Sequence, residues 1–264
     1  RKVVVITGGA GGIGKALARR WTLEGARIAL LDFEPDALED AVTALRATGA
    51  DVMGVTVDVT DYSACERAMD RVVEHYSGID VLVNNAGAVH RSGFKETAID
   101  VYRQVMEVNL FGSLHCARAA LPALLQSHGL IVVTSSVAGI APLYGRTGYA
   151  ASKHALHGLF ESARSELLDD GVDVLMVCPS FVRSRFEQRA LGADGKPAGT
   201  RRSLVGSLAE PDELAALVVK AAGRRKQLLL QGWQGKLSYY LSRLAPRYYT
   251  RAMVARLKDD SGFH

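Results

Sequence analysis

Apolar positions along the chain follow two alternating patterns. Short runs rich in β-branched residues, of the length of buried strands, alternate with longer stretches in which apolar residues recur every three to four positions, as in helices. The predicted strands cover residues 3–6, 27–31, 52–57, 81–83, 130–133, 172–177 and 227–230. The predicted helices cover about 12–24, 35–48, 61–77, 99–127, 147–169 and 210–222.

This order predicts an α/β fold. Continuously apolar strands separated by helices are typical of a parallel sheet that is covered on both faces. We therefore expect a Rossmann-type doubly wound sheet of about seven parallel strands within residues 1–232, with residues 233–264 as a helical extension of the same domain. Residues 180–207 have weak periodicity and a Gly-rich turn composition, which predicts a mobile loop over a ligand site.

Composition narrows the functional classes. The formal net charge is +4, but residues 214–258 hold ten Lys or Arg and no acidic residue, so the remainder has 22 basic against 28 acidic residues. This basic and aromatic extension suits an amphipathic helix that serves as a lid, a subunit contact or a peripheral membrane contact. The acidic body gives no reason to expect nucleic-acid binding.

The cysteines and the hydropathy bear on location. The three cysteines are far apart in the chain and form no metal-binding motif, so neither a disulfide framework nor a bound metal is expected. No continuous apolar run reaches the roughly 20 residues of a membrane-spanning helix, and no signal peptide is evident. We expect a cytoplasmic protein, with membrane association through the extension left open.

A glycine-rich turn directly follows the first predicted strand. Residues 7–14 read Thr-Gly-Gly-Ala-Gly-Gly-Ile-Gly, a sequence that brings backbone amides and a helix N-terminus close to a diphosphate. The turn fits two dinucleotide-binding templates and nearly fits a P-loop. The P-loop interpretation fails because Ala16 stands where a hydroxyl would hold Mg²⁺.

The second strand ends in a carboxylate about 20 residues after this turn. Asp32 can accept hydrogen bonds from an adenosine ribose and repel a 2′-phosphate, and neither Phe33 nor Gly11 offers a cation for that phosphate. These features predict NAD as the cofactor in preference to NADP. An Asp that merely caps a turn before Pro35 is the alternative.

Tyr149 and Lys153 are four residues apart on a predicted helix, so both side chains can reach one cleft. A nearby ammonium favours the phenolate of a tyrosine, whose pKa is otherwise about 10, and so makes the phenol usable as an acid or base. Ser136 follows the fifth strand, where its hydroxyl can hydrogen-bond the same substrate oxygen.

Taken together, these residues resemble the short-chain dehydrogenase/reductase family in order along the chain to about residue 185. The matching positions are Thr7-Gly8-x3-Gly12-Ile13-Gly14, Asn84-Asn85-Ala86-Gly87, Asn109, Ser136, Tyr149-x3-Lys153 and Pro179. The resemblance implies hydride transfer between nicotinamide and a carbinol or carbonyl carbon, without metal, in a homodimer or homotetramer.

The resemblance also implies residue roles. Tyr149 would be the proton donor or acceptor, Ser136 would orient the substrate oxygen, Lys153 would also bind the nicotinamide ribose, and Asn109 would hold a water. Asp58 resembles the adenine-contacting Asp of the family, although it could instead cap the next helix. The full cofactor-binding set expected is Gly8, Gly11, Gly12, Ile13, Gly14, Asp32, Phe33, Asp58, Val59, Asn85, Ala86, Gly87, Tyr149, Lys153, Pro179 and Val182.

One motif departs from the family pattern, and the substrate-binding residues are inferred only from their positions in the sequence. Ser180 stands where the family usually has Gly after Pro179, which bears on the seating of the nicotinamide amide. The expected substrate-binding residues are Ser136, Leu143, Tyr144, Tyr149, Phe181 and Phe186. His90 and Arg91 are interpreted as surface loop residues.

The sequence therefore predicts an NAD-dependent oxidoreductase of secondary alcohols or ketones. By analogy with family members that have an apolar loop and an aromatic extension, we expect a bulky lipophilic substrate such as a hydroxysteroid. The alternatives are an NADP-dependent carbonyl reductase of the same family and a catalytically idle dinucleotide sensor or scaffold.

Overall fold

A computed structural model describes residues 1–183, 185–198 and 208–261. Seven strands form one parallel sheet in the order β3-β2-β1-β4-β5-β6-β7. They are β1 (Val3–Thr7), β2 (Arg27–Asp32), β3 (Val52–Thr56), β4 (Val81–Asn84), β5 (Leu130–Thr134), β6 (Asp173–Cys178) and β7 (Leu228–Leu230). The sheet order reverses between β1 and β4, which in such folds is where ligands bind.

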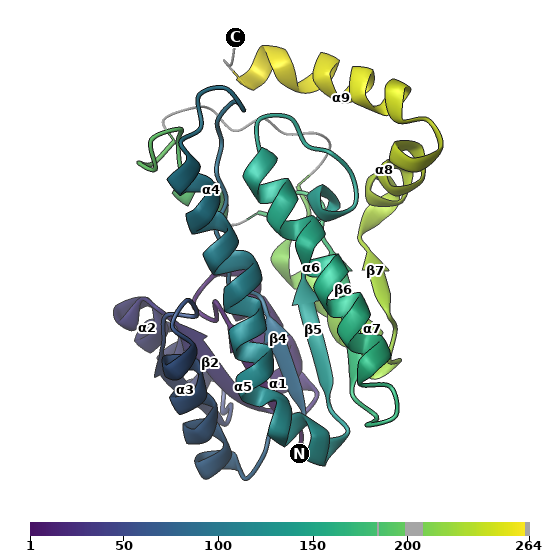
Figure 1. Ribbon diagram of the computed structural model, residues 1–264. Helices are drawn as coiled ribbons and strands as arrows, with labels where there is room; N and C mark the ends of the chain where they lie inside the picture. The colour runs from purple at the N-terminus through teal and green to yellow at the C-terminus, as the bar shows by residue number, and fades with distance from the viewer. Residues whose placement is uncertain (184, 199–207, 262–264) are drawn as a thin grey trace.

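Helices cover both faces of the sheet (Figure 1). One face packs against α1 (Gly12–Leu23), α2 (Pro35–Arg46) and α7 (Pro211–Gly223), and the other against α3 (Tyr62–Tyr76), α5 (Gly112–Ser127) and α6 (Thr147–Glu166). Alternate β1 residues serve the two cores: Val4 and Ile6 pack on the first face, Val3 and Val5 on the second. The α/β doubly wound fold expected from the sequence is confirmed.

The long helix expected at 99–127 is divided by a wider turn. It consists of α4 (Ile99–Met106), a π-helical turn η1 (Glu107–Phe111) and α5. Periodicity cannot reveal one extra residue in a helical turn, and π-helical turns are common at functional sites. By length and composition residues 99–127 could also cross a membrane. In this structure, however, Cys116, Ala120 and Leu124 of this segment are buried and pack in the core against the sheet.

The chain after β7 forms two further helices. Helices α8 (Gly232–Leu244) and α9 (Pro246–Ser261) lie beyond the carboxyl ends of the strands (Figure 1). Two short 3-10 turns, η2 (Val137–Gly139) and η3 (Arg185–Arg189), lie at the same end. Residue 184 and residues 199–207 of the expected mobile loop lie outside the described residues.

Candidate active site

A cavity of about 1750 Å³ opens at the carboxyl ends of the strands. Residues at or just after the ends of six strands line it, as expected for a parallel sheet that binds a ligand at its switch point. These are Gly8 after β1, Asp32 in β2, Asp58 after β3, Asn85 after β4, Ser136 after β5 and Pro179 after β6.

The glycine-rich turn has a backbone that side chains would disturb. Gly8 has φ +62°, and a Cβ there would lie 2.9 Å from the Ala86 Cα. At Gly14 a Cβ would collide with the Gly8 carbonyl oxygen, so Gly14 holds the turn against α1 and is not among the residues that line the cavity. Gly11 is the N-cap of α1 and supplies no side-chain cap, which leaves the helix N-terminus to a ligand.

The Asp32 carboxylate both supports this turn and lines the cavity. Its Oδ2 accepts a hydrogen bond from the Ala10 N–H at 2.9 Å, and its Oδ1 accepts one from the Glu34 N–H at 3.3 Å. Asp58, Val59 and Phe33 continue the same wall, and Phe33 is 63% exposed. The expected adenosine-binding residues therefore lie together.

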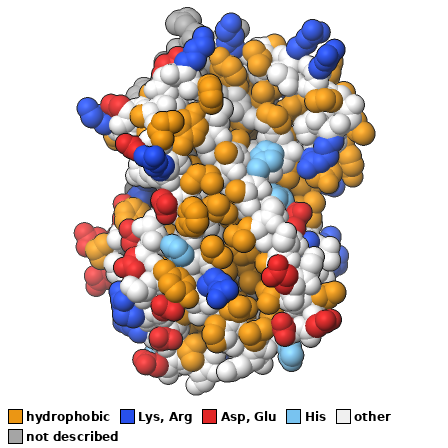
Figure 2. Space-filling view, in the orientation of Figure 1, with side chains coloured by type: hydrophobic (Ala, Val, Ile, Leu, Met, Phe, Trp, Pro, Cys, Tyr) orange, Lys and Arg blue, Asp and Glu red, His pale blue; other side chains and the backbone are white. Residues whose placement is uncertain are grey.

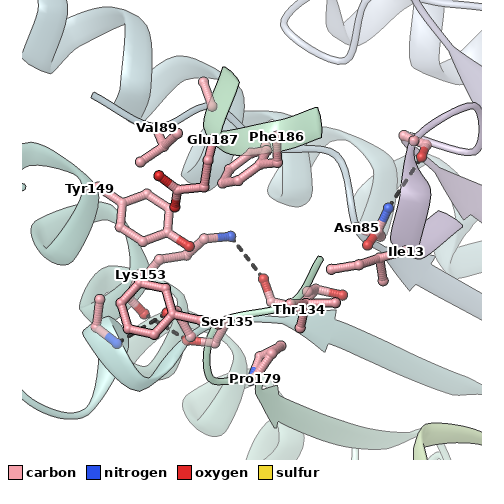
Figure 3. Close-up of a pocket in the computed structure, with 18 of the residues that line it drawn as sticks. Ile13, Asn85, Val89, Thr134, Ser135, Tyr149, Lys153, Pro179, Phe186 and Glu187 are labelled. Carbon is pink, nitrogen blue, oxygen red and sulfur yellow. Dashed lines mark hydrogen bonds between the residues drawn. The ribbon is translucent and has the colours of Figure 1, made fainter. Parts of the chain in front are cut away.

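Thr7 and Asn85 bind the turn after β1 to the turn after β4. The Thr7 hydroxyl accepts hydrogen bonds from the backbone N–H groups of Asn85 and Ala86 at 2.9 and 3.0 Å. The Asn85 amide donates to the Thr7 carbonyl at 3.0 Å and the Gly8 carbonyl at 3.2 Å. Figure 3 shows Asn85 with its hydrogen bond to the residue drawn beside it. These bonds fix the cavity floor between the two strands.

Tyr149, Ser136 and Lys153 all line this cavity, and Figure 3 shows Tyr149 beside Lys153. Tyr149 and Lys153 are one turn apart on α6, and Ser136 precedes η2. The Ser136 side chain hydrogen-bonds Tyr149 and lowers its pKa, but the larger effect of burial raises that pKa to about 12. A neutral phenol in hydrogen-bond contact with a hydroxyl is suited to donating a proton to a carbonyl oxygen.

The Lys153 ammonium points toward the end of β5. It donates to the Thr134 carbonyl at 2.8 Å and lies 5.8 Å from the Tyr149 ring centroid. Burial lowers the pKa of Lys153 to about 8. The cationic group that lowers the Tyr149 pKa in this arrangement is Arg146, not Lys153 as expected from the spacing.

Asn109 lies behind the cavity in the π-helical turn and is fully buried. Its amide donates to the Ala88 carbonyl at 2.9 Å and the Ser152 hydroxyl at 2.8 Å, and its Oδ1 accepts from the Ala88 N–H at 2.7 Å. A Cβ on Gly87 would lie 3.1 Å from this Oδ1 and 3.7 Å from the Lys153 Nζ. Asn109 thus reaches the Lys153 neighbourhood without lining the cavity.

A buried ion cluster beside Tyr149 was missed in the sequence. The Glu187 carboxylate, from η3, forms two hydrogen bonds with the Arg146 guanidinium, at 2.6 and 2.9 Å. Its Oε2 lies 3.5 Å from an Arg91 nitrogen, and Arg91 also donates to the Glu187 carbonyl at 3.1 Å. Glu187 raises the pKa of Tyr149. Sequence spacing holds no signal for this cluster, because its members come from three separate loops.

His90 and Arg91 are not surface loop residues, so that interpretation was wrong. His90 is 0% exposed and Arg91 6% exposed. The His90 Nε2 accepts the Gly148 N–H at 2.8 Å, while its Nδ1 lies 3.0 Å from the Ser92 hydroxyl. Burial, together with Arg146, lowers the pKa of His90 to about 4, so the ring is neutral and able to accept.

Most of the expected substrate residues line the cavity. Leu143, Phe181 and Phe186 do so, and the Phe186 ring lies 6.2 Å from that of Tyr149, whereas Tyr144 is not among the lining residues. The sequence analysis left a lid as one role of the extension but named none of the residues by which it lines the cavity. These are Gln234, Gly235, Leu237, Ser238 and Leu241 of α8, with Tyr249, Ala252, Met253, Arg256 and Leu257 of α9.

The donor set fits a nicotinamide dinucleotide. An uncapped helix N-terminus beside Gly11 suits a diphosphate, and the Asp32 carboxylate at the end of β2 suits a ribose. Ser180, which replaces the usual Gly, donates its backbone N–H to the Gln231 side chain at 3.3 Å, while Pro179 and Val182 line the cavity.

Comparisons with known proteins agree with this geometry. Residues 2–193 match the protein-family model described as short chain dehydrogenase. The dehydrogenase/reductase SDR family member 7B of Rattus norvegicus is 32% identical over 267 residues, covering 98% of this chain and 82% of that protein.

Two solved structures are similar to this chain over most of their length. A short-chain dehydrogenase/reductase from Burkholderia phymatum in complex with NAD has a TM-score of 0.84 and 28% identity, and 94% of each chain is covered. An alcohol dehydrogenase from the archaeon Thermococcus sibiricus complexed with 5-hydroxy-NADP has a TM-score of 0.74 and 27% identity, with 86% of this chain and 94% of that one covered. The two relatives thus carry different nicotinamide cofactors.

Proposed function

The chain belongs to the short-chain dehydrogenase/reductase family, and we propose that it transfers a hydride between NAD(H) and a secondary alcohol or ketone. The observation that carries this proposal is the meeting of Tyr149, Ser136 and Lys153 in the same cavity as the glycine-rich turn and Asp32. A dinucleotide sensor or scaffold would not need a buried phenol paired with a hydroxyl.

Each side chain has one task in the proposed reaction. Bound NAD(H) would supply or accept the hydride. Ser136 hydrogen-bonds the substrate oxygen, and Tyr149 gives that oxygen its proton in reduction or removes it in oxidation. The Arg146 guanidinium is the cation that favours the Tyr149 phenolate, and Lys153 is proposed to bind the ribose.

We propose NAD in preference to NADP. The Asp32 carboxylate would compete with a 2′-phosphate for the same space, and Phe33 beside it is apolar. One related structure carries NAD and another an NADP derivative, so family membership alone leaves both open. An NADP-dependent carbonyl reductase remains the alternative of the same class.

The proposed substrate is bulky and lipophilic, as a hydroxysteroid is. The cavity lining includes Leu143, Phe181, Phe186, Leu241 and Met253, all apolar, and the Phe186 ring lies 6.2 Å from that of Tyr149. An apolar wall favours an apolar substrate, because each Å² of apolar surface that binding removes from water stabilises the complex by about 25 cal/mol. Small polyols would leave their hydroxyl groups without partners there.

We also propose a homodimer or homotetramer in a reducing compartment, the cytoplasm. Support for this location comes from Cys65, Cys116 and Cys178, which are free thiols, all of them buried. Sedimentation velocity would give the oligomeric state.

Nicotinamide absorbance during turnover tests the function. NAD⁺ and NADP⁺ would be supplied in turn with secondary alcohols, polyols and hydroxysteroids. Turnover with NAD⁺ should fall by at least about 10²-fold in Tyr149→Phe, the usual contribution of general acid–base catalysis. Tyr62→Phe, on the exposed side of α3, is the matched control and should keep the activity. NADH binding without turnover on any substrate would favour the idle sensor.

A further inference from the structure

Helix α8 presents an apolar stripe to solvent. Trp233, Leu237, Tyr240 and Leu244 follow one another at intervals of four, three and four residues, so they share one face of the helix. Their exposed fractions are 70%, 50%, 59% and 82%. Four large apolar side chains aligned and exposed in this way mark an interaction surface.

The opposite face of α8 fixes the direction of this stripe. Gln234, Gly235, Ser238 and Leu241 line the cavity. The Ser242 hydroxyl and the Arg243 guanidinium donate to the Ile140 carbonyl at 3.4 and 3.0 Å, which joins α8 to the residue after η2. The apolar stripe therefore cannot turn inward without breaking the cavity wall.

Helix α9 adds positive charge to the same end of the molecule. Arg247, Arg251 and Lys258 are exposed and share one helical face, while Met253 and Leu257 face the cavity. Blue and orange side chains gather over α8 and α9 at the upper right of Figure 2. Helix α9 contains four Arg or Lys residues and two acidic residues, Asp259 and Asp260 at its C-terminal end, so its net charge is positive.

We propose that α8 and α9 dock on an anionic lipid bilayer, with the α8 stripe at the boundary between headgroups and acyl chains. Interfacial helices combine Trp and Leu on one side with Lys and Arg beside them, and each cation near an anionic surface adds to the attraction. A second copy of the chain fits less well, because a twofold contact of this face would place two surfaces of the same positive charge opposite each other.

The docking surface is continuous with the cavity through Leu237, which is exposed on the stripe and also lines the cavity. A lipophilic molecule could thus pass from the bilayer to Tyr149 beside α8. This route rests on the proposed function, whereas the docking itself does not.

The chain carries its own probe for a test. It has two tryptophans: Trp21 is 5% exposed in the core, and Trp233 is 70% exposed on the stripe. The intact protein would be titrated with phosphatidylcholine vesicles and with vesicles containing about 30% phosphatidylserine, with fluorescence and co-sedimentation as readouts. We expect a blue shift and pelleting with the anionic vesicles only, at least tenfold weaker in 0.5 M salt.

Two double variants address the two parts of the surface. Tyr240→Ser with Leu244→Ser removes apolar contact, and Arg247→Gln with Arg251→Gln removes charge; none of these four residues lines the cavity. Each pair should weaken anionic-vesicle binding at least tenfold and leave NADH binding unchanged. The matched control, Leu23→Ser with Leu168→Ser, removes two leucines that are 75% and 68% exposed on other elements and should bind like the unaltered protein.

Three results would overturn the proposal. The first is that the protein binds both kinds of vesicle equally or binds neither. The second is that neither double variant of the surface weakens binding to anionic vesicles. The third is a blue shift that grows with protein concentration in the absence of lipid and disappears in Tyr240→Ser with Leu244→Ser. The last result would assign the stripe to self-association. Because vesicle binding requires no turnover, a failure of the proposed enzymatic function would show separately.

Discussion

A single buried imidazole holds the start of the helix that carries Tyr149 and Lys153. The first N–H groups of a helix have no partner within it, and Arg146, the N-cap of α6, supplies no side-chain cap. His90 accepts the Gly148 N–H instead, from the segment that follows β4. A Cβ on Gly148 would lie 3.1 Å from the His90 Nε2, so this close approach requires Gly148. We regard His90 as a positioning residue for Tyr149.

Substitution of His90 tests this role. In His90→Leu the Gly148 N–H is left buried without an acceptor, which should cost about 1–3 kcal/mol of stability and lower kcat more than it raises KM. His90→Gln retains an oxygen acceptor and should recover most of kcat. Equal kcat in the two variants would contradict the role.

The same residue gives a pH dependence. The His90 pKa is about 4 in the folded chain and 6.5 otherwise, so the unfolded state binds more protons between these values. The stability present above pH 6.5 should therefore be lost as pH falls toward 4, by about 2 kcal/mol. Denaturant unfolding at pH 7 and pH 4.5 should show this loss in the unaltered protein and a smaller one in His90→Gln.

At the scale of elements, η3 closes the cavity above Tyr149 and is held by charge. The segment after β6 and the segment after β4 also share backbone bonds, from the Arg91 N–H to the Leu191 carbonyl at 2.7 Å and from the Leu191 N–H to the Val89 carbonyl at 2.9 Å. Phe186 and Glu187, neighbours in η3, both line the cavity. The ion cluster therefore fixes the position of η3 and with it the apolar side chain of Phe186 in the cavity.

Glu187→Gln should act on both the wall and the phenol. Loss of the carboxylate breaks the two hydrogen bonds that pair Glu187 with the buried Arg146 guanidinium, which should destabilise the chain by about 3 kcal/mol. It also removes a charge that raises the Tyr149 pKa, so the pH profile of alcohol oxidation should move to lower pH. Initial rates between pH 6 and 10 measure the shift. Arg19→Gln, which breaks the exposed ion pair with Asp212 outside the cavity lining, is the control and should leave the profile in place.

The elements themselves were predictable because each carries a local signal. Strands such as β1 and β5 are short apolar runs, and the glycine-rich turn, Ser136 and the Tyr149–Lys153 spacing lie in fixed positions after strands. The ion cluster and the contact between His90 and Gly148 could not be predicted from the sequence, because Glu187 and Arg146 are 41 residues apart and His90 and Gly148 are 58 apart. The cavity walls from α8 and α9 depend on how two distant helices return over the sheet, which no local pattern encodes.

At the scale of the whole molecule, the cavity takes its lining from nearly the full length of the chain. It is lined by the turns after β1 to β6 and by residues of α6, α8 and α9. A cofactor that binds the folded state alone should stabilise all of these segments by mass action.

Thermal unfolding with each cofactor tests the NAD preference. NADH at about 100 times its Kd should stabilise the fold by about 2.7 kcal/mol, and Tm should rise by about 5–10 °C. NADPH at the same concentration should give a smaller shift because of Asp32. In Asp32→Asn, which keeps an oxygen acceptor for the Ala10 N–H, the difference between the two cofactors should shrink. An equal shift with both cofactors in the unaltered protein would argue against NAD preference.

The roof formed by α8 and α9 has a consequence for how this protein can diversify. The contacts of the roof with the rest of the chain include hydrogen bonds to the Ile140 and Pro142 carbonyls, which are backbone groups. Backbone acceptors persist whatever side chains stand at those positions. The donors are the Arg243 and Tyr249 side chains, so a pair of helices from a relative with donors at these two positions should dock in the same place. The thermal stability of a chimaera joined after β7 would test this expectation.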